Sequence, residues 1–239
     1  MTGIGRAGHD RPDSCGRTGL DQVGRDLTRN PNVIVRDVEV TSDGWHVLRR
    51  TTFDYRRRNG RWETQQRESY DRGNGATILL YDARRRTVLL TRQFRFPAYV
   101  NGHPDGELIE AAAGLLDDKA PATAIRREAQ EELGVTVGEL DHIVDVYMSP
   151  GSVTERLHLY AAPYTPAART EPGGGISDEG EDIAVVELPY EQTLGMIADG
   201  RIADGKTIML LYWAALDGPF AGGGCSPTAN SRCPVLPAS

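Results

Sequence analysis

The sequence predicts an α+β fold, a sandwich of sheets and helices that begins with an antiparallel β region. Segments that alternate apolar and polar residues recur between residues 33 and 163, which is typical of strands. The dipeptides Asp43-Gly44 and Asn59-Gly60 suit hairpin turns and separate the first three of these segments. Segments with helical spacing are few and lie mostly near the C-terminal end. Many strands with a few interspersed helices indicate this class.

The expected elements can be placed along the chain by their periodicity. Strands are expected at 33–40, 45–55, 61–70, 76–81, 87–94, 107–112, 140–147, 156–163 and 183–188. Helices are expected at 121–133, 190–198 and 206–216. The first three strands form an N-terminal β region, because the two hairpin turns join them directly.

The ends of the chain differ in composition from its middle. Residues 1–31 are rich in Gly, Arg, Asp and Asn, and residues 218–239 contain three consecutive glycines and four prolines. Such segments bury too little apolar surface to offset the entropy lost on ordering. We therefore expect disordered tails at both ends, an N-terminal β region at 32–72 and a main domain at 73–217.

Composition limits the classes of function. The net charge of -7 argues against a nucleic-acid partner, although a bound divalent cation could still attract a small anionic substrate. No apolar run approaches the roughly 20 residues of a membrane helix, and the first residues lack the apolar core of a secretory signal. We therefore expect no membrane partner and a cytoplasmic location. The three cysteines lie near the chain ends and the five histidines lack metal-ligand spacing, so neither set predicts a metal site.

The helix expected at 121–133 carries the most informative side chains. Its apolar residues recur at helical spacing and form a face for the core: Ala122, Ile125, Ala129 and Leu133. Glu128 and Glu132 are four residues apart and stack on a neighbouring face, with Glu131 beside both. Stacked carboxylates repel each other, and Mg²⁺ would offset the repulsion because it prefers oxygen ligands. A solvated acidic face that Arg126 and Arg127 steady explains the helix alone equally well.

The nine residues 127–135, REAQEELGV, resemble the second half of the Nudix box at every defined position. The first half departs from the box. Gly114 is followed by five residues and then by Ala120, where the box has a glutamate, and Arg127 comes one residue early. The loop is therefore one residue shorter than the box requires.

Residues from about 35 to 216 resemble more closely the GDP-mannose pyrophosphatase branch of the Nudix family, which shares the shorter loop. The matching stretches lie at 70–80, 92–95, 113–117, 147–151, 153–155, 181–183 and 204–207. The resemblance implies the Nudix fold, an α/β/α sandwich with a mixed sheet. It also implies hydrolysis of GDP-mannose to GMP and mannose 1-phosphate with Mg²⁺, or Mn²⁺ in its place. The enzyme would be a homodimer whose N-terminal β region serves both dimerisation and base recognition.

The same resemblance implies roles for individual residues. The metal ligands would be the carbonyl of Ala113 and the carboxylates of Glu128, Glu131, Glu132 and Glu181. The catalytic residues would be Glu128, Glu132, Glu155 and Glu181, with Glu155 positioning or deprotonating the attacking water. The substrate would contact Trp45, Gln66, Arg67, Glu68, Arg95, Ala113, Gly114, Leu115, Glu155 and Lys206. Arg95 is expected to grip phosphate, since a guanidinium can donate two hydrogen bonds to it.

Two other functions remain open on the sequence. Trp45 and Gln66 stand where the branch usually has Tyr and Lys, so a substrate such as ADP-ribose or another nucleoside diphosphate is an alternative. A catalytically weak nucleotide-binding or regulatory module is the other, and Ala120 is its only support. The complete set of Glu128, Glu132 and Glu181 argues against this last reading.

Overall fold

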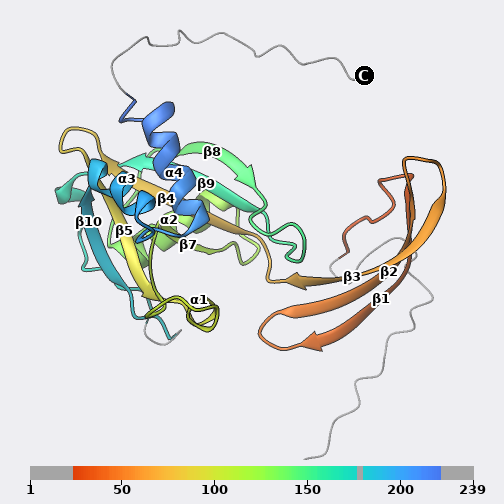
Figure 1. Cartoon of the computed structure of the whole chain (residues 1–239). Helices are drawn as coiled ribbons and strands as arrows, with labels where there is room; N and C mark the ends of the chain where they lie inside the picture. The colour runs from red at the N-terminus through yellow and green to blue at the C-terminus, as the bar shows by residue number, and fades with distance from the viewer. Residues whose placement is uncertain (1–23, 177–179, 222–239) are drawn as a thin grey trace, which may run out of the picture. The chain divides into compact units, whose positions relative to one another are not determined.

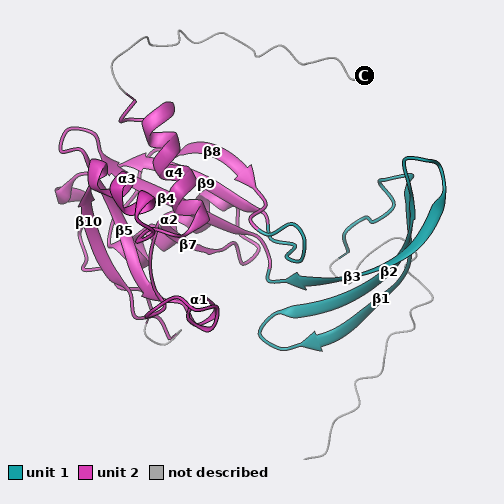
Figure 2. Cartoon of the chain, in the orientation of Figure 1, with its two compact units in different colours: residues 1–72, 149–155 teal, residues 73–148, 156–239 magenta. Residues whose placement is uncertain are grey.

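The computed structural model describes residues 24–176 and 180–221, which divide into two compact units (Figure 2). The first unit comprises the chain up to Arg72 together with Ser149–Glu155, and the second comprises Gly73–Met148 and the chain from Arg156 onward. Residues 1–23 and 222–239, most of the two predicted tails, lie outside the described residues. The first division between the units falls between Arg72 and Gly73.

The first unit is a three-stranded antiparallel sheet in the order β1-β2-β3, as the hairpin turns predicted (Figure 1). Its strands are β1 (Val33–Asp43), β2 (Val47–Arg56) and β3 (Trp62–Asp71). The segment Ser149–Glu155 joins this unit through hydrogen bonds to Tyr70. The Tyr70 amide donates to the Ser152 carbonyl at 2.7 Å, and the Thr154 amide donates to the Tyr70 carbonyl at 3.0 Å.

The second unit contains a mixed sheet whose main path runs β10-β5-β4-β9-β8. These strands are β4 (Gly75–Asp82), β5 (Thr87–Phe94), β8 (Asp141–Val146), β9 (Leu157–Pro163) and β10 (Ala184–Pro189). The neighbours β4 and β9 are parallel, and the other pairs along the path are antiparallel. The sheet is therefore mixed, as the resemblance implied.

The strand predicted at 107–112 is in fact two strands with different partners. β6 (Glu107–Glu110) pairs with β5, and β7 (Ala112–Leu115) pairs with β4. Ala111 lies between them, and its amide donates to the Thr207 hydroxyl at 2.7 Å. The break places Glu110 at the end of one strand and starts a second strand that carries Ala113 and Gly114.

Helices cover both faces of the mixed sheet. α2 (Pro121–Leu133), α3 (Tyr190–Ala198) and α4 (Gly205–Leu216) lie where the sequence predicted helices, whereas the short helices α1 (Phe96–Val100) and η1 (Pro166–Ala168) were not predicted. Successive residues of β4 point to opposite faces. Leu79 packs in one core cluster with residues of α3 and α4, and Ile78 and Leu80 pack in the other with residues of α2. The predicted α/β/α sandwich is confirmed.

The described residues continue past α4 to Ala221. Phe220 is buried and its ring stacks on Tyr190, with the ring centroids 4.1 Å apart. None of the helices in the described ranges is long and apolar enough to cross a membrane.

Candidate functional site

The glutamates of α2 lie beside the apolar face that anchors this helix. Ile125, Ala129 and Leu133 are fully buried against the sheet, so the helix cannot rotate without exposing them. Glu128 and Glu132 occupy the neighbouring face and are themselves buried. The helix ends at Gly134, whose φ of 71° suits glycine.

Glu128 packs directly against β7. A Cβ atom added to Gly114 would lie 2.2 Å from the Glu128 carboxyl carbon, so glycine is needed for this approach. Arg127 Nη2 donates to Glu128 Oε1 at 2.7 Å and to Asp117 Oδ2 at 3.3 Å. Arg127 Nη1 also lies 3.8 Å from Glu131 Oε2. One arginine therefore faces three carboxylates.

A glycine loop brings Glu181 to the end of α2. The Gly174 amide donates to the Glu132 carbonyl at 2.9 Å, and the Gly175 amide donates to the Glu131 carbonyl at 3.1 Å. These carbonyls belong to the last turn of the helix, where they have no partner within the helix. The Ile176 amide then donates to Glu181 Oε2 at 2.9 Å, which fixes the Glu181 carboxylate.

Electrostatics show that the three glutamates form one cluster. Burial raises the pKa of Glu128 to about 7, Arg127 opposes the rise, and Glu131 and Glu181 add to it. Burial raises the pKa of Glu132 to about 8, and Glu128 and Glu181 raise it further. Arg95 and a hydrogen bond from the Ala113 amide act in the other direction on Glu132. Buried carboxyl groups that repel one another in this way fit a hard divalent cation, whose charge would offset the repulsion.

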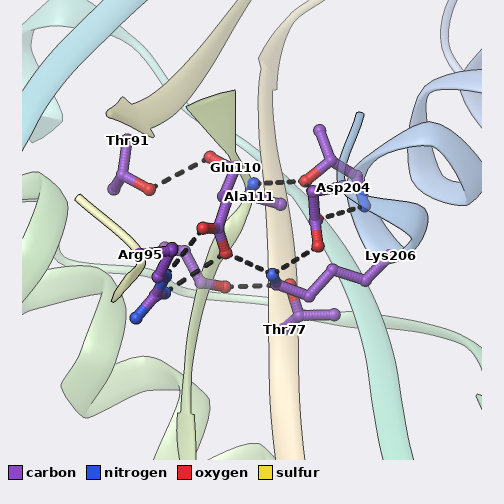
Figure 3. Close-up of polar contacts among 9 residues, drawn as sticks. Thr77, Thr91, Arg95, Glu110, Ala111, Asp204 and Lys206 are labelled. Carbon is purple, nitrogen blue, oxygen red and sulfur yellow. Dashed lines mark hydrogen bonds and ion pairs between the residues drawn. The ribbon is translucent and has the colours of Figure 1, made fainter. Parts of the chain in front are cut away.

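A second polar cluster lies around Glu110 in the same unit (Figure 3). Arg95 Nε and Nη2 donate to the two oxygens of Glu110 at 2.7 and 3.2 Å. Lys206 Nζ donates to Glu110 Oε2 and lies 3.0 Å from Asp204 Oδ1. Burial alone would raise the pKa of Glu110, but Lys206 and Arg95 lower it to about 2. Arg95 and Lys206 are therefore held in place by one buried carboxylate.

Sequence reasoning singled out Arg95 and Lys206 but missed their partners Glu110 and Asp204. Glu110 had one local signal, a charge inside the otherwise apolar run 108–113. Asp204 had the signal of a helix cap before Gly205, and its carboxylate accepts a hydrogen bond from the Thr207 amide at 3.0 Å.

Leu115 ends β7 in the second unit, whereas four other residues implied by the resemblance belong to the first unit. Trp45 lies in the turn between β1 and β2, and 89% of its surface is exposed. Gln66, Arg67 and Glu68 are consecutive on β3. Gln66 Nε2 donates to the Thr52 hydroxyl at 3.2 Å, and Glu68 Oε1 accepts a hydrogen bond from Arg50 at 3.3 Å.

Glu155 also belongs to the first unit, in the segment Ser149–Glu155. Its carboxylate lies 3.5 Å from Arg72 Nε, and its side chain is 15% exposed.

Comparison with known proteins shows the family. A model of the Nudix domain matches residues 71–211, and a model of the N-terminal domain of the GDP-mannose pyrophosphatase NudK matches residues 32–70. The first match covers more than half of the chain, so the chain belongs to the Nudix family. It is a Nudix hydrolase, an enzyme that acts on diphosphate bonds and, as such enzymes generally do, uses a divalent metal ion.

Several curated relatives bear the name GDP-mannose pyrophosphatase. The relative from Pectobacterium atrosepticum is 55% identical over 185 residues, which cover 77% of this chain and 95% of the relative. Those from Enterobacter sp. and Klebsiella pneumoniae are 50% and 48% identical, covering 79% and 80% of this chain and 97% and 96% of the relatives.

A solved structure supports the fold. The crystal structure of an ADP compounds hydrolase aligns with 79% of this chain and 97% of its own, with a TM-score of 0.58 and 17% identity. At this identity the likeness concerns the fold alone.

Proposed function

We propose that this chain hydrolyses GDP-mannose to GMP and mannose 1-phosphate with Mg²⁺, for which Mn²⁺ can substitute. The observation that carries the reaction type is the convergence of Glu128, Glu132 and Glu181, three carboxylates from two separate segments. The relatives that bear the name of this activity support the substrate, since they match over nearly their whole length.

The metal ligands are the carboxylates of Glu128, Glu132 and Glu181 with the carbonyl of Ala113, and Glu131 lies beside them. Support for Ala113 comes from its amide, which donates to Glu132. In an extended strand the amide and carbonyl of one residue point to the same side, so this carbonyl also faces the glutamates. When bound there, the ion would supply positive charge that favours attack of water on the diphosphate.

The substrate diphosphate is bound by cations and backbone groups of the second unit. Arg95 Nε and Nη2 donate hydrogen bonds to Glu110. Nη1 is therefore the nitrogen that reaches phosphate. Lys206 adds positive charge beside it. Gly114 and Leu115 follow Ala113 on β7 and offer backbone groups to the same region.

The first unit supplies base recognition and the water-activating group in this proposal. Trp45 is exposed and free to stack on a base. Gln66 and Glu68 point to one face of β3 and Arg67 to the other, so these polar side chains can contact base and ribose from a fixed strand. Glu155 positions or deprotonates the attacking water.

We further propose a cytoplasmic homodimer that binds its nucleotide-sugar substrate and neither nucleic acid nor membrane. The net charge of -7 supports the absence of a nucleic-acid partner. The first unit supports the dimer, because β1 and β3 are edge strands that a second copy can cover. Light scattering on the purified protein tests the dimer, and a monomer mass would refute it.

A substrate panel tests the function. The purified chain is assayed in Mg²⁺ with GDP-mannose, GDP-glucose, ADP-ribose and ADP-mannose, and the products are identified by chromatography. We expect GDP-mannose to have the highest kcat/KM and to yield GMP and mannose 1-phosphate. A higher kcat/KM for ADP-ribose would replace the substrate assignment with the alternative.

One variant tests the reaction type independently of which substrate is preferred. Glu132→Gln removes one charge from the metal site, and we expect kcat to fall by at least ~100-fold with every substrate of the panel. Tight binding of GDP-mannose without turnover by the unaltered chain would instead indicate a binding module.

A further inference from the structure

Two histidines and an aspartate converge at the β8 edge of the mixed sheet. His142 and Asp145 lie on β8, and His158 lies on the neighbouring strand β9. Asp145 Oδ1 is 2.7 Å from His142 Nε2 and 2.7 Å from His158 Nδ1. One ligand atom from each residue lies within 4.8 Å of those of the other two. The sequence showed no metal-ligand spacing because this set spans two strands.

A β-bulge makes the convergence possible. His142 and Asp145 are three residues apart, so a regular strand would point them to opposite faces of the sheet. The register of β8 with β9 shifts between His142 and Val144, which inserts one residue. Such an insertion re-aims the side chains that follow it. His142 and Asp145 therefore both point to the face on which His158 lies.

We propose that His142, Asp145 and His158 bind a divalent transition-metal ion of the Zn²⁺ class, at a site separate from the glutamates of α2. Two imidazole nitrogens and one carboxylate oxygen are ligands that Zn²⁺ prefers, whereas Mg²⁺ prefers oxygen alone. Ligands at about 2.0–2.1 Å around a tetrahedral ion lie about 3.3 Å from one another. The two 2.7 Å contacts therefore need to open by only about half an ångström.

The surroundings of the three ligands suit an open site with one water. The side chain of His158 is 8% exposed and that of His142 is 50% exposed, so neighbours fix one ligand while the other borders solvent. The His142 ring also packs edge-on against Tyr160, with the ring centroids 5.2 Å apart. Arg156 Nε lies 3.9 Å from Asp145 Oδ2 and steadies the oxygen that faces away from the histidines. Three protein ligands and one water complete a tetrahedral shell.

The position of the site distinguishes it from the glutamate cluster. A row of directly paired residues crosses four neighbouring strands in the order Asp145, His158, Ala76, Gly114. Directly paired residues point to the same face, and Gly114 touches Glu128 of α2. Two strand spacings separate His158 from Gly114, about 10 Å at the usual spacing. The two ion sites therefore share a face of the sheet without sharing a ligand.

A metal titration tests the proposal in the full chain. Cys15, Cys225 and Cys233 are changed to Ser so that thiolates cannot compete, the protein is freed of metal with a chelator, and excess Mg²⁺ is kept present. We expect Co²⁺ to bind with one equivalent and to give the visible absorption of a tetrahedral site, and Zn²⁺ to displace it. Zn²⁺ should also raise the Tm, because it binds only the folded state of this site.

Matched variants locate the ion. We expect His158→Gln, Asp145→Asn and His142→Gln each to weaken Zn²⁺ binding by at least ~100-fold, since even changes around the ligands cost about 10–100-fold. His46→Gln, in the first unit, and Glu132→Gln should bind Zn²⁺ as the unaltered chain does. If His158→Gln fails to fold because His158 is buried, Zn²⁺ binding by His142→Gln, at a half-exposed position, still tests the site. Absence of stoichiometric binding in Mg²⁺, or loss with Glu132→Gln but not with His142→Gln, would overturn the proposal.

Discussion

Glu128 and Glu132 hold their protons unusually tightly in the metal-free protein. Their pKa values of about 7 and about 8 lie well above 4.5, first because the groups are buried. Glu131 and Glu181 then raise the pKa of Glu128, and Glu128 and Glu181 raise that of Glu132. A cation that binds them must therefore displace protons near neutral pH. The ionisation of two side chains thus couples metal affinity to pH.

The first prediction concerns this coupling. Between about pH 4.5 and 8 the folded metal-free protein binds more protons than the unfolded chain, so its stability falls as pH rises through that window. Mg²⁺ relieves this loss, so we expect the Mg²⁺-induced rise in Tm to be larger at pH 8 than at pH 6. Below pH 7 we expect Mg²⁺ affinity to fall by up to ~10-fold per pH unit for each displaced proton. Calorimetry at several pH values measures this, and an affinity independent of pH would contradict it.

Glu110 shows the opposite behaviour for a buried carboxylate. Its side chain is 4% exposed, and Arg95 and Lys206 together outweigh the effect of burial on its pKa. It is ionised at neutral pH and holds both cations, of which Arg95 also acts on Glu132.

The second prediction concerns its removal. A folded-state pKa of about 2 against 4.5 corresponds to about 3 kcal/mol of stability, present above pH 4.5 and lost as pH falls toward 2. We expect Glu110→Gln to lower the free energy of unfolding at pH 7 by about this amount, and the difference from the unaltered chain to shrink at pH 2.5. Urea titrations at the two pH values measure it.

Glu107→Gln on the same strand is the control. The Glu107 side chain is 41% exposed and lies 3.8 Å from Arg92, so its loss should change stability by less than about 1 kcal/mol. Equal losses from the two changes would show that the pairing of Glu110 contributes nothing specific.

At the scale of elements, the loop after η1 joins two parts of the candidate site. Gly174 and Gly175 donate their amides to the last turn of α2, and the same loop continues to Glu181. Gly175 has a φ of 77°, and a Cβ atom there would lie 2.4 Å from Glu181 Oε2. Glycine at this position therefore meets two requirements: it adopts the positive φ, and it leaves room for the Glu181 carboxylate.

The third prediction separates these two requirements. Gly175→Ala and Gly200→Ala both place alanine at positive φ, 77° and 82°, and both should lose roughly 1–2 kcal/mol of stability. A Cβ at Gly200 meets no described atom within 4 Å, whereas that at Gly175 displaces Glu181. We expect only Gly175→Ala to lower kcat by at least ~10-fold at saturating Mg²⁺. Similar kcat values for the two variants would show that the position of Glu181 does not affect the reaction.

Elements whose signals are local could be predicted from the sequence. α2 was placed with its bounds, since its proline start, glycine end and apolar face all lie within residues 121–134. The break at Ala111 was missed, because it depends on a hydrogen bond to Thr207, which lies 96 residues away. The short helix α1 carries no polar and apolar pattern by which it could be found.

The same distinction applies to the candidate site. The glutamates of α2 share one motif, so spacing and resemblance were enough to single them out. Glu110 has partners 15 and 96 residues away, and its role depends on burial that no local pattern reveals. Asp145 needed a bulge in β8 to point to the same face as His142 and His158, and a bulge has no clear signal in a single sequence.

At the scale of the whole molecule, the proposed metal ligands all belong to the second unit. The first unit carries the proposed base-recognition residues and Glu155 instead. Metal binding and nucleotide recognition are thus assigned to different units of one chain.

The fourth prediction follows from this division. We expect Mg²⁺ alone to slow amide hydrogen exchange at Gly174, Gly175 and the last turn of α2, because the ion ties Glu181 to the helix. The amides of β1, β2 and β3 should exchange at an unchanged rate. Mass spectrometry of exchanged peptides measures both, and Glu132→Gln should abolish the effect. Protection confined to the first unit would contradict the assignment of the ligands.

The hydrogen bonds between Tyr70 and the segment Ser149–Glu155 have an evolutionary consequence. The N-terminal unit is not one uninterrupted piece of chain, since Ser152 and Thr154 complete it from within the following domain. A recombination event that exchanged residues 24–72 between two relatives would separate Tyr70 from the loop with which it evolved. We therefore expect the two segments to be inherited as a matched set, and chimeras that exchange both to fold better than chimeras that exchange one.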